Sequence, residues 1–198
     1  MKICIIDYGM GNIASVTNAI HYLKKEVDLV SNPNEINNYD IIILPGVGSF
    51  SKAMEILEEN EVDKAIKDSV SKGKRLIGIC LGMQLLFTES MEFGVTNGLN
   101  LIEGKVLPFE SKNDLRIPHM GWNSSISESE GFKHLNGDYY FVHSFYCRPN
   151  DQEHILFKTN YGINFCSGIN LDDQIFGFQF HPEKSQKLGL KLLDKVLK

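Results

Sequence analysis

The stretch Arg75-Leu-Ile-Gly-Ile-Cys-Leu-Gly-Met-Gln-Leu-Leu-Phe87 predicts a buried strand, a sharp turn and a helix, in that order. Leu76, Ile77 and Ile79 are apolar, as in a strand covered on both faces. Those after Gly82 favour a helix or a core position. Cys80 lies between the two elements with Gly78 and Gly82 two positions to either side, which is the spacing of a nucleophile elbow with cysteine in the serine position.

This spacing has a physical reason. A nucleophile on a strained turn stands clear of the sheet, and the residues two positions away then lie so close to neighbouring backbone that a Cβ atom would collide. The free N–H groups of the following helix favour a thiolate at Cys80 and could stabilise an oxyanion, beginning with the N–H of Leu81. The alternative is that Cys80 is a small buried hydrophobic residue.

Size and composition predict one globular domain spanning residues 1–198. Of the 198 residues, 42% are hydrophobic and 23% charged, and the net charge is −5. Without a basic cluster a nucleic-acid surface is not expected. No apolar run is long enough to span a bilayer, and residues 1–7 favour a first strand over a signal peptide, so we expect a cytoplasmic protein without membrane contact.

The cysteines and histidines lack the paired spacing of metal ligands. We therefore expect no metal site and no disulfide, with the cysteines as buried free thiols: Cys4, Cys80, Cys147 and Cys166. Gly9-Met-Gly11 is only a fragment of a dinucleotide-binding fingerprint, because the third glycine is missing. No cofactor is predicted.

The periodicity of the chain predicts an α/β fold with a doubly wound, mostly parallel sheet flanked by helices. Strands are expected at 2–7, 27–30, 40–44 and 75–79, and helices from 13 onward, at 50–59, at 62–71 and at 185–197. Residues 31–38 are expected to be exposed turns. Further strands at 105–109, 139–147, 155–159, 164–169 and 174–180 suggest an antiparallel extension.

Two segments could meet Cys80 at the edge of this sheet. Pro45-Gly-Val-Gly48 follows a buried strand, and loops at that end of a parallel strand hold ligands in α/β proteins. His181-Pro-Glu183 follows the 174–180 strand, and side chains two apart on an extended segment point the same way. A carboxylate that orients an imidazole, which in turn activates a cysteine, is the logic of a catalytic triad.

The sequence resembles the class I (triad) glutamine amidotransferases over nearly its whole length, and within that class the glutaminase subunits of imidazole glycerol phosphate synthase. The motifs that carry the resemblance are Asp7-Tyr-Gly-Met-Gly-Asn12, Pro45-Gly-Val-Gly48, Gly78-Ile-Cys-Leu-Gly-Met-Gln84, Pro118-His-Met-Gly-Trp-Asn123, Tyr140-Phe-Val-His-Ser144 and Gln179-Phe-His-Pro-Glu-Lys184. The first and the fourth are typical of this subunit. The resemblance implies a flavodoxin-like fold.

The resemblance also implies roles for individual residues. Cys80 would attack the side-chain amide of glutamine, His181 would transfer protons, and Glu183 would orient His181. The oxyanion would be bound by the N–H groups of Val47 and Leu81. The substrate would be held by Gly46, Gly48, Gln84 and the backbone of His143, Ser144 and Phe145. From the residues alone, His143 fits a structural residue that presents its backbone better than a second base, and Gln84 could be only a polar helix residue.

By the same resemblance, the partner would be a cyclase subunit with a (β/α)8 barrel, bound as a heterodimer and receiving ammonia for histidine biosynthesis. The docking face would include Asn12, Pro118, His119, Met120, Gly121, Trp122, Asn123 and Lys184. From the sequence alone Trp122 could instead belong to the core.

The sequence departs from the family pattern in two places. Phe145 replaces a usual second tyrosine, and Ile13-Ala14 replaces Leu-Arg, which removes a cation near the implied docking face. Three rival functions therefore stay open: amidotransfer to a surface sugar or polysaccharide precursor, a stand-alone thiol hydrolase such as a γ-glutamyl peptidase, and a binding module without catalysis. The nucleophile and the histidine are both present, which argues against the last.

Overall fold

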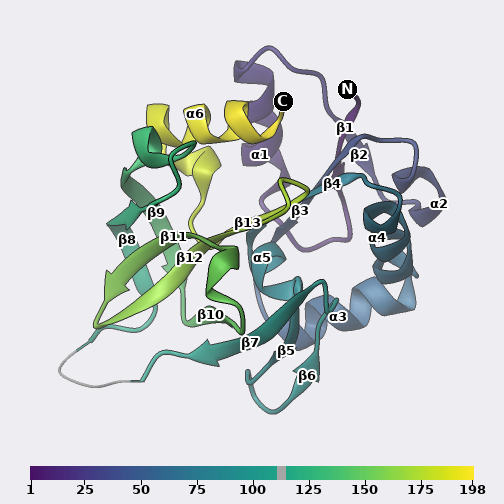
Figure 1. Cartoon of the computed structure of the whole chain (residues 1–198). Helices are drawn as coiled ribbons and strands as arrows, with labels where there is room; N and C mark the ends of the chain where they lie inside the picture. The colour runs from purple at the N-terminus through teal and green to yellow at the C-terminus, as the bar shows by residue number, and fades with distance from the viewer. Residues whose placement is uncertain (111–114) are drawn as a thin grey trace.

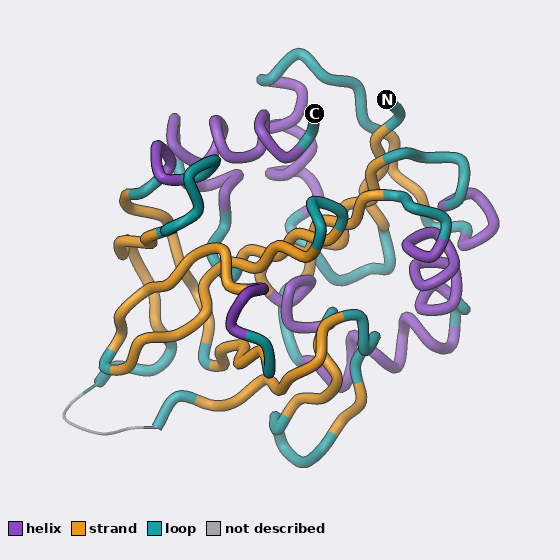
Figure 2. Tube along the Cα trace, viewed as in Figure 1, coloured by secondary structure: helices purple, strands orange, loops and turns teal. Residues whose placement is uncertain are grey.

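The computed structural model describes residues 1–110 and 115–198, which form one large mixed sheet with helices on both sides (Figures 1 and 2). Half of the sheet is parallel, with the strand order β2 (Asp28–Val30), β1 (Ile3–Ile6), β3 (Ile41–Gly46), β4 (Arg75–Cys80) and β13 (Ile175–Phe178). This order is that of a flavodoxin-like doubly wound sheet, so the predicted fold class is confirmed.

The sheet continues beyond β13 as the predicted antiparallel extension. Its main path runs through β12 (Ile163–Leu171), β10 (Phe145–Pro149), β7 (Ile102–Pro108), β5 (Phe87–Ser90) and β6 (Thr96–Asn97), where only β7 and β5 pair in parallel. A branch leaves β12 through β11 (Ile155–Tyr161), β8 (His119–Ile126) and β9 (Gly137–His143).

Helices cover both faces of the parallel half, and its inner strands β1 and β3 are accordingly apolar and buried throughout. Alternate residues of β1 show this: Cys4 and Ile6 belong to one core cluster, whereas Ile3 and Ile5 belong to the other. The first cluster includes α3 (Phe50–Glu59), α4 (Val62–Ser71) and α5 (Leu81–Leu85), and the second includes α1 (Ile13–Tyr22) and α6 (Gln186–Val196). Three short 3₁₀ turns complete the described chain: η1 (Lys133–Leu135), η2 (Gln152–His154) and η3 (Pro182–Lys184).

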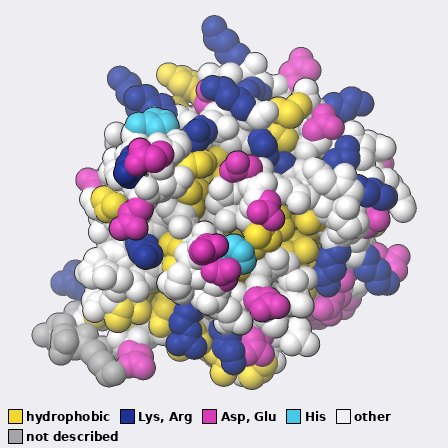
Figure 3. Space-filling view, viewed as in Figure 1, with side chains coloured by type: hydrophobic (Ala, Val, Ile, Leu, Met, Phe, Trp, Pro, Cys, Tyr) yellow, Lys and Arg dark blue, Asp and Glu magenta, His cyan; other side chains and the backbone are white. Residues whose placement is uncertain are grey.

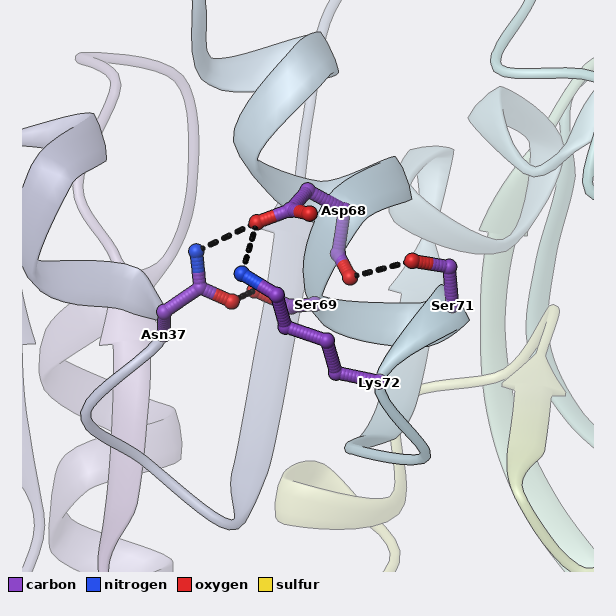
Figure 4. Close-up of polar contacts among 5 residues, drawn as sticks. All are labelled: Asn37, Asp68, Ser69, Ser71 and Lys72. Atoms are coloured by element: carbon purple, nitrogen blue, oxygen red, sulfur yellow. Dashed lines mark hydrogen bonds and ion pairs between the residues drawn. The ribbon is translucent and has the colours of Figure 1, made fainter.

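The segment 31–38, predicted as exposed turns, contains the short helix α2 (Pro33–Ile36), whose Ile36 is buried. Polar contacts fasten its end to α4 (Figure 4). Asn37 Nδ2 donates to Asp68 Oδ2 at 2.7 Å, and Ser69 Oγ donates to Asn37 Oδ1 at 2.8 Å. Packing against α4, which is distant in the sequence, therefore outweighs the local turn propensity of this segment.

Two further boundaries differ from the prediction. Residues 139–147 were expected to form one strand, but the chain breaks at Ser144 into β9 and β10. The break occurs because β9 pairs with β8 while β10 pairs with β7 and β12. The segment 119–126, where no strand was predicted, forms β8.

The four cysteines are buried and free, as predicted. Within the described residues no group of three or more His, Cys, Asp or Glu side chains is arranged to hold a metal ion. None of the described helices combines the length and hydrophobicity needed to cross a membrane. Basic and acidic side chains are interspersed on the face shown in Figure 3.

Candidate active site

The predicted sharp turn is present at Cys80, the last residue of β4, which has φ 56° and ψ −112°. A positive φ at a residue other than glycine is strained and is a frequent mark of a functional site. The helix α5 begins at the next residue, Leu81. Its first N–H groups have no partner within the helix and therefore remain available beside the sulfur.

The two flanking glycines are required by close backbone contacts. A Cβ atom on Gly78 would lie 2.7 Å from the carbonyl oxygen of Gly82, and one on Gly82 would lie 1.8 Å from that of Leu44. Both distances are far below van der Waals contact, so α5 packs against β3 and β4 only because these side chains are missing. The sequence argument for glycine at these positions is confirmed.

His181 lies just beyond β13, the strand adjacent to β4 in the sheet. Its Nδ1 lies 2.8 Å from Glu183 Oε1, and these two side chains are only 2% and 0% exposed. The predicted pairing is present, but its backbone explanation was wrong. Pro182 begins the 3₁₀ turn η3, so the segment is not extended, and this turn brings the carboxylate back to the ring.

Strand β9 fixes this turn from the other side. The N–H of His181 donates to the carbonyl oxygen of Tyr140 at 2.9 Å, and Ser185 Oγ donates to the carbonyl oxygen of His181 at 2.6 Å. The N–H of Tyr140 in turn donates to Ser185 Oγ at 3.0 Å. The ring of His181 is thus held by backbone contacts as well as by its carboxylate.

The electrostatic surroundings of His181 favour its charged form. Burial lowers the pKa of this imidazole, but the interactions with the Cys80 sulfur and the Glu183 carboxylate outweigh burial and raise the pKa to about 10. Because Nδ1 is held by Glu183, the nitrogen that interacts with Cys80 is Nε2. Nε2 has no aligned hydrogen-bond partner among the described residues, and the Cys80 thiol donates to the Val142 carbonyl at 3.8 Å.

A cavity of about 290 Å³ opens beside Cys80. It is lined by Val47, Gly48, Cys80, Leu81, Gln84, Glu92, Pro118, Val142, His143, Ser144 and Phe145. Most of the residues predicted to bind substrate or oxyanion therefore meet at one cavity. Gly46, His181 and Glu183 do not line it, so a molecule in the cavity contacts the sulfur while His181 and Glu183 lie behind the wall.

The loop after β3 is held tightly against the elbow. Gly46 pairs with Cys80 in the sheet register, and a Cβ on Gly46 would lie 2.8 Å from the Tyr8 hydroxyl. That hydroxyl donates to the carbonyl oxygen of Pro45 at 3.0 Å. Gly48 has a φ of 101°, which favours glycine. The loop thus brings Val47 to the cavity wall, where Leu81 also lies.

Gln84 forms part of the cavity wall and is hydrogen-bonded to neighbouring residues. Its Nε2 donates to the carbonyl oxygen of Phe145 at 3.2 Å and to Gln179 Oε1 at 3.0 Å. Because the amide nitrogen is used in these two bonds, the amide oxygen is the atom left for a ligand. Gln84 is therefore more than a polar residue on a helix.

Sequence reasoning missed Glu92. This residue is 9% exposed, lines the cavity, and accepts the N–H of Phe50 on its Oε2 at 2.6 Å. It is the single carboxylate among the described lining residues, so it can complement the ammonium group of an amino acid. In the sequence it stands in Met91-Glu-Phe-Gly94, which reads as an ordinary turn and carries no signal of this role.

The residues predicted to face a partner fall into two groups. Met120 and Trp122 are 62% and 49% exposed on alternate positions of β8, so Trp122 is not part of the core. His119, between Pro118 and Met120, is only 3% exposed. The side chain of His119 therefore faces the interior, because successive strand residues point to opposite faces, and the prediction that it forms part of a docking surface is wrong for this side chain.

The other predicted docking residues remain accessible to different degrees. Lys184 and Pro118 are exposed, and Asn12, Gly121 and Asn123 are partly buried. Asn12 occupies the N-cap position of α1 as expected, but its side chain makes no capping hydrogen bond.

Comparison with known proteins gives a consistent family assignment. The family model described as glutamine amidotransferase class-I matches residues 4–197. The imidazole glycerol phosphate synthase subunit HisH of Helicobacter hepaticus is 43% identical and covers 100% of this chain and 98% of its own length. The subunits of the same name from Aquifex aeolicus and Chlorobaculum tepidum are 45% and 44% identical, covering 98% and 96% of this chain and 95% and 96% of their own lengths.

Solved structures agree on the fold. A crystal structure described as a glutamine amidotransferase superposes with a TM-score of 0.79 at 16% identity and covers 98% of this chain and 96% of its own. The structure described as PurLQS from Thermotoga maritima superposes with a TM-score of 0.77 at 20% identity and covers 99% of this chain and 97% of its own.

Proposed function

Because this chain belongs to the class-I glutamine amidotransferase family, we propose that it is the glutaminase subunit of an imidazole glycerol phosphate synthase. It hydrolyses glutamine to glutamate and supplies the ammonia to a cyclase partner. Relatives of that name align with this chain over nearly their whole length. The observation that carries the chemistry is Cys80 at the cavity wall with the buried His181–Glu183 pair behind it.

The first half of the reaction forms a thioester. The Cys80 thiolate attacks the side-chain carboxamide carbon of glutamine, a C–S bond forms, and the carbonyl electrons move to the oxygen. The N–H groups of Val47 and Leu81 bind this oxyanion, and losing one such donor costs about 3 kcal/mol of barrier. The His181 imidazolium gives its proton to the nitrogen as the C–N bond breaks, and ammonia leaves.

The second half regenerates the thiolate. Neutral His181 takes a proton from water, and the resulting hydroxide attacks the thioester carbon. The C–S bond breaks with the sulfur leaving as thiolate, and the new carboxylic acid gives its proton to water as glutamate leaves with the added oxygen. Glu183 holds the ring through Nδ1 in both halves, and the raised pKa of His181 supports an imidazolium in the resting site.

The cavity supports glutamine as the substrate. Glu92 complements the α-ammonium group, the oxygen of Gln84 remains as an acceptor, and the backbone from His143 to Phe145 lies along the wall. A free amino acid with a carboxamide side chain presents groups complementary to these. The roles of individual residues stay predictions until variants are assayed.

The partner is proposed as a (β/α)8-barrel cyclase bound as a heterodimer. Its docking face includes the exposed apolar side chains Met120 and Trp122 of β8, next to Pro118 at the cavity wall. An exposed apolar strip beside an active site is suited to a partner that covers the exit. The single-domain organisation and the cytoplasmic location stay predictions from the sequence.

The proposal is tested by comparing the synthase reaction fed by glutamine with the same reaction fed by ammonium salts. Cys80→Ala, assayed with the co-purified cyclase, should abolish synthesis fed by glutamine and leave synthesis fed by ammonium salts intact. Cys4→Ala is the matched control, because Cys4 is a fully buried thiol whose pKa burial raises to about 12, and this variant should keep both activities. Equal loss with both nitrogen sources would contradict the proposal.

A further experiment distinguishes the cyclase from other enzymes that could receive the ammonia. If the partner is an enzyme that amidates a surface sugar, the organism's own cyclase will not stimulate glutaminase activity. If the chain is a stand-alone hydrolase, its glutaminase or γ-glutamyl peptidase activity will be high without any partner.

A further inference from the structure

Two further histidines are buried at the cavity wall: His143 lines the cavity, and His119 lies behind it. His119 Nδ1 lies 2.8 Å from His143 Nε2, across the β8–β9 pair. His143 Nδ1 lies 2.7 Å from the carbonyl oxygen of Phe145. On the other side, Asn123 Nδ2 lies 3.2 Å from His119 Nε2. These contacts form one continuous chain of polar atoms from β8 to the substrate cavity.

The chemistry of the groups determines which atom donates at each step. A carbonyl oxygen can only accept, so His143 carries its proton on Nδ1. A neutral imidazole then accepts on Nε2, so His119 must donate from its own Nδ1. Nε2 of His119 therefore accepts from the amide of Asn123, which also donates to the carbonyl oxygen of Asn160 at 2.9 Å. Every ring nitrogen is satisfied by a single proton arrangement.

The surroundings keep both rings neutral. His119 stacks on Phe141 and Tyr161 with ring centroids 4.6 and 3.9 Å apart, and Phe109 meets His143 edge-on at 5.3 Å. Burial in this aromatic cluster lowers the pKa of His119 to about 4 and that of His143 to about 3. A charged ring would also lose the acceptor nitrogen on which the chain depends.

The chain of hydrogen bonds ends at a substrate-binding side chain. The carbonyl oxygen of Phe145 accepts from two donors, His143 Nδ1 and Gln84 Nε2. Gln84 lines the cavity, and its amide nitrogen is shared between this carbonyl and Gln179. The position of the Phe145 carbonyl therefore sets which way the amide of Gln84 is turned.

We propose that His119 and His143 are positioning residues for the substrate glutamine, acting as a one-way chain of hydrogen bonds that fixes the Phe145 carbonyl and through it the amide of Gln84. This inference rests on the proposed glutaminase function. Neither ring transfers a proton in the reaction. If His119 no longer donates, His143 keeps an unpaired buried Nε2 or moves its proton there and turns a lone pair toward the Phe145 carbonyl.

The first test reads the tautomers in the free chain and needs no activity. Two-bond ¹H–¹⁵N correlation spectra of ¹⁵N-histidine-labelled protein at pH 7 should show both rings neutral with the proton on Nδ1. His119→Phe and His143→Phe assign the two signals. A ring protonated on Nε2 alone, or on both nitrogens, would overturn the inference whether or not the chain is a glutaminase.

The second test separates positioning from folding. His119→Phe keeps an aromatic ring in the cluster but removes the donor, whereas His119→Asn places an amide N–H near the position of Nδ1. With saturating cyclase, His119→Phe should raise KM for glutamine about tenfold with kcat changed less than about threefold, and His119→Asn should restore KM to within about threefold. A folded His119→Phe protein with unchanged KM would overturn the inference.

The two proposals fail in different ways. If the wild-type chain hydrolyses no glutamine, the proposed function fails, and the Gln84 side-chain amide signal replaces KM as the readout. It should shift in His119→Phe and return in His119→Asn. If the wild-type chain is active but neither KM nor the Gln84 signal responds, only the positioning role fails.

Discussion

His181 and His143 are both buried, and each places Nδ1 within 2.8 Å of an oxygen atom, yet their surroundings favour opposite charges. The oxygen beside His181 is a carboxylate and its other nitrogen interacts with a sulfur, which raises its pKa to about 10. The oxygen beside His143 is a neutral carbonyl, and burial lowers its pKa to about 3. The charge of the partner, and not the depth of burial, thus separates the proposed proton-transfer group from the proposed positioning group.

The largest expected effect is a difference between matched substitutions at the two histidines. His181→Asn should lower the glutaminase kcat by roughly 10⁴-fold or more, because neither the thiolate nor the leaving nitrogen has its proton partner. His143→Asn should lower kcat less than about tenfold, since asparagine can still donate to the Phe145 carbonyl. Steady-state glutaminase assays with the cyclase present measure both. Similar losses of kcat in the two variants would remove the distinction.

A smaller effect is expected when the carboxylate beside His181 is made neutral. Attraction to Glu183 contributes to the raised pKa, so wild-type kcat/KM should fall only as the pH approaches about 10, where the imidazolium loses its proton. Glu183→Gln should move this alkaline limb to lower pH and reduce kcat about a hundredfold, less than His181→Asn does. A pH profile of kcat/KM from pH 6 to 10.5 measures the limb. An unshifted limb would show that Cys80 alone sets the charge of the ring.

The smallest expected effect is the contribution of His119 and His143 to the loss of folding stability in acid. His119 and His143 have folded pKa values of about 4 and about 3, below the value of 6.5 for an ordinary histidine. The unfolded chain therefore binds protons that the folded chain excludes. Their contribution to stability is complete above about pH 6.5 and is lost progressively as the pH falls toward 3.

Urea unfolding at pH 7 and pH 5 measures this loss. His119→Phe removes one of the two groups, so its free energy of unfolding should fall less than that of the wild type over this interval, by about 1–2 kcal/mol. His181, with its raised pKa, contributes in the opposite direction, but it is present in both proteins and cancels in the comparison. An equal acid sensitivity of wild type and variant would mean that folding does not lower the pKa of His119.

The sequence predicted the features that depend on local spacing. The glycines around Cys80 and the apolar strand before it are readable because their constraints lie within a few residues. The proximity of His181 and Glu183 was also predictable, although Pro182 begins a turn that the extended-strand argument did not foresee. These successes all concern contacts made within one segment or at the shared edge of a parallel sheet.

Features that depend on distant partners were not predictable. The break at Ser144 exists because the chain changes pairing partners there, and no residue near 144 encodes the partner strands. Glu92 reaches the cavity only through the fold of the β5–β6 region, and the inward direction of His119 follows from the register of β8 on β9. The resemblance assigned His119 to the docking segment 118–123, but it could not show that the side chain of His119 points into the protein.

Strand β13 lies at the centre of the sheet, between β4 and β12, although it is the last strand of the described chain. A polypeptide leaving the ribosome therefore presents the thiol of Cys80 long before the strand that carries His181 has been made. Insertion between two existing strands is a non-local and slow step of folding. Incomplete chains consequently hold Cys80 without its proposed base, so the proposed hydrolysis of glutamine has to wait for the completed chain.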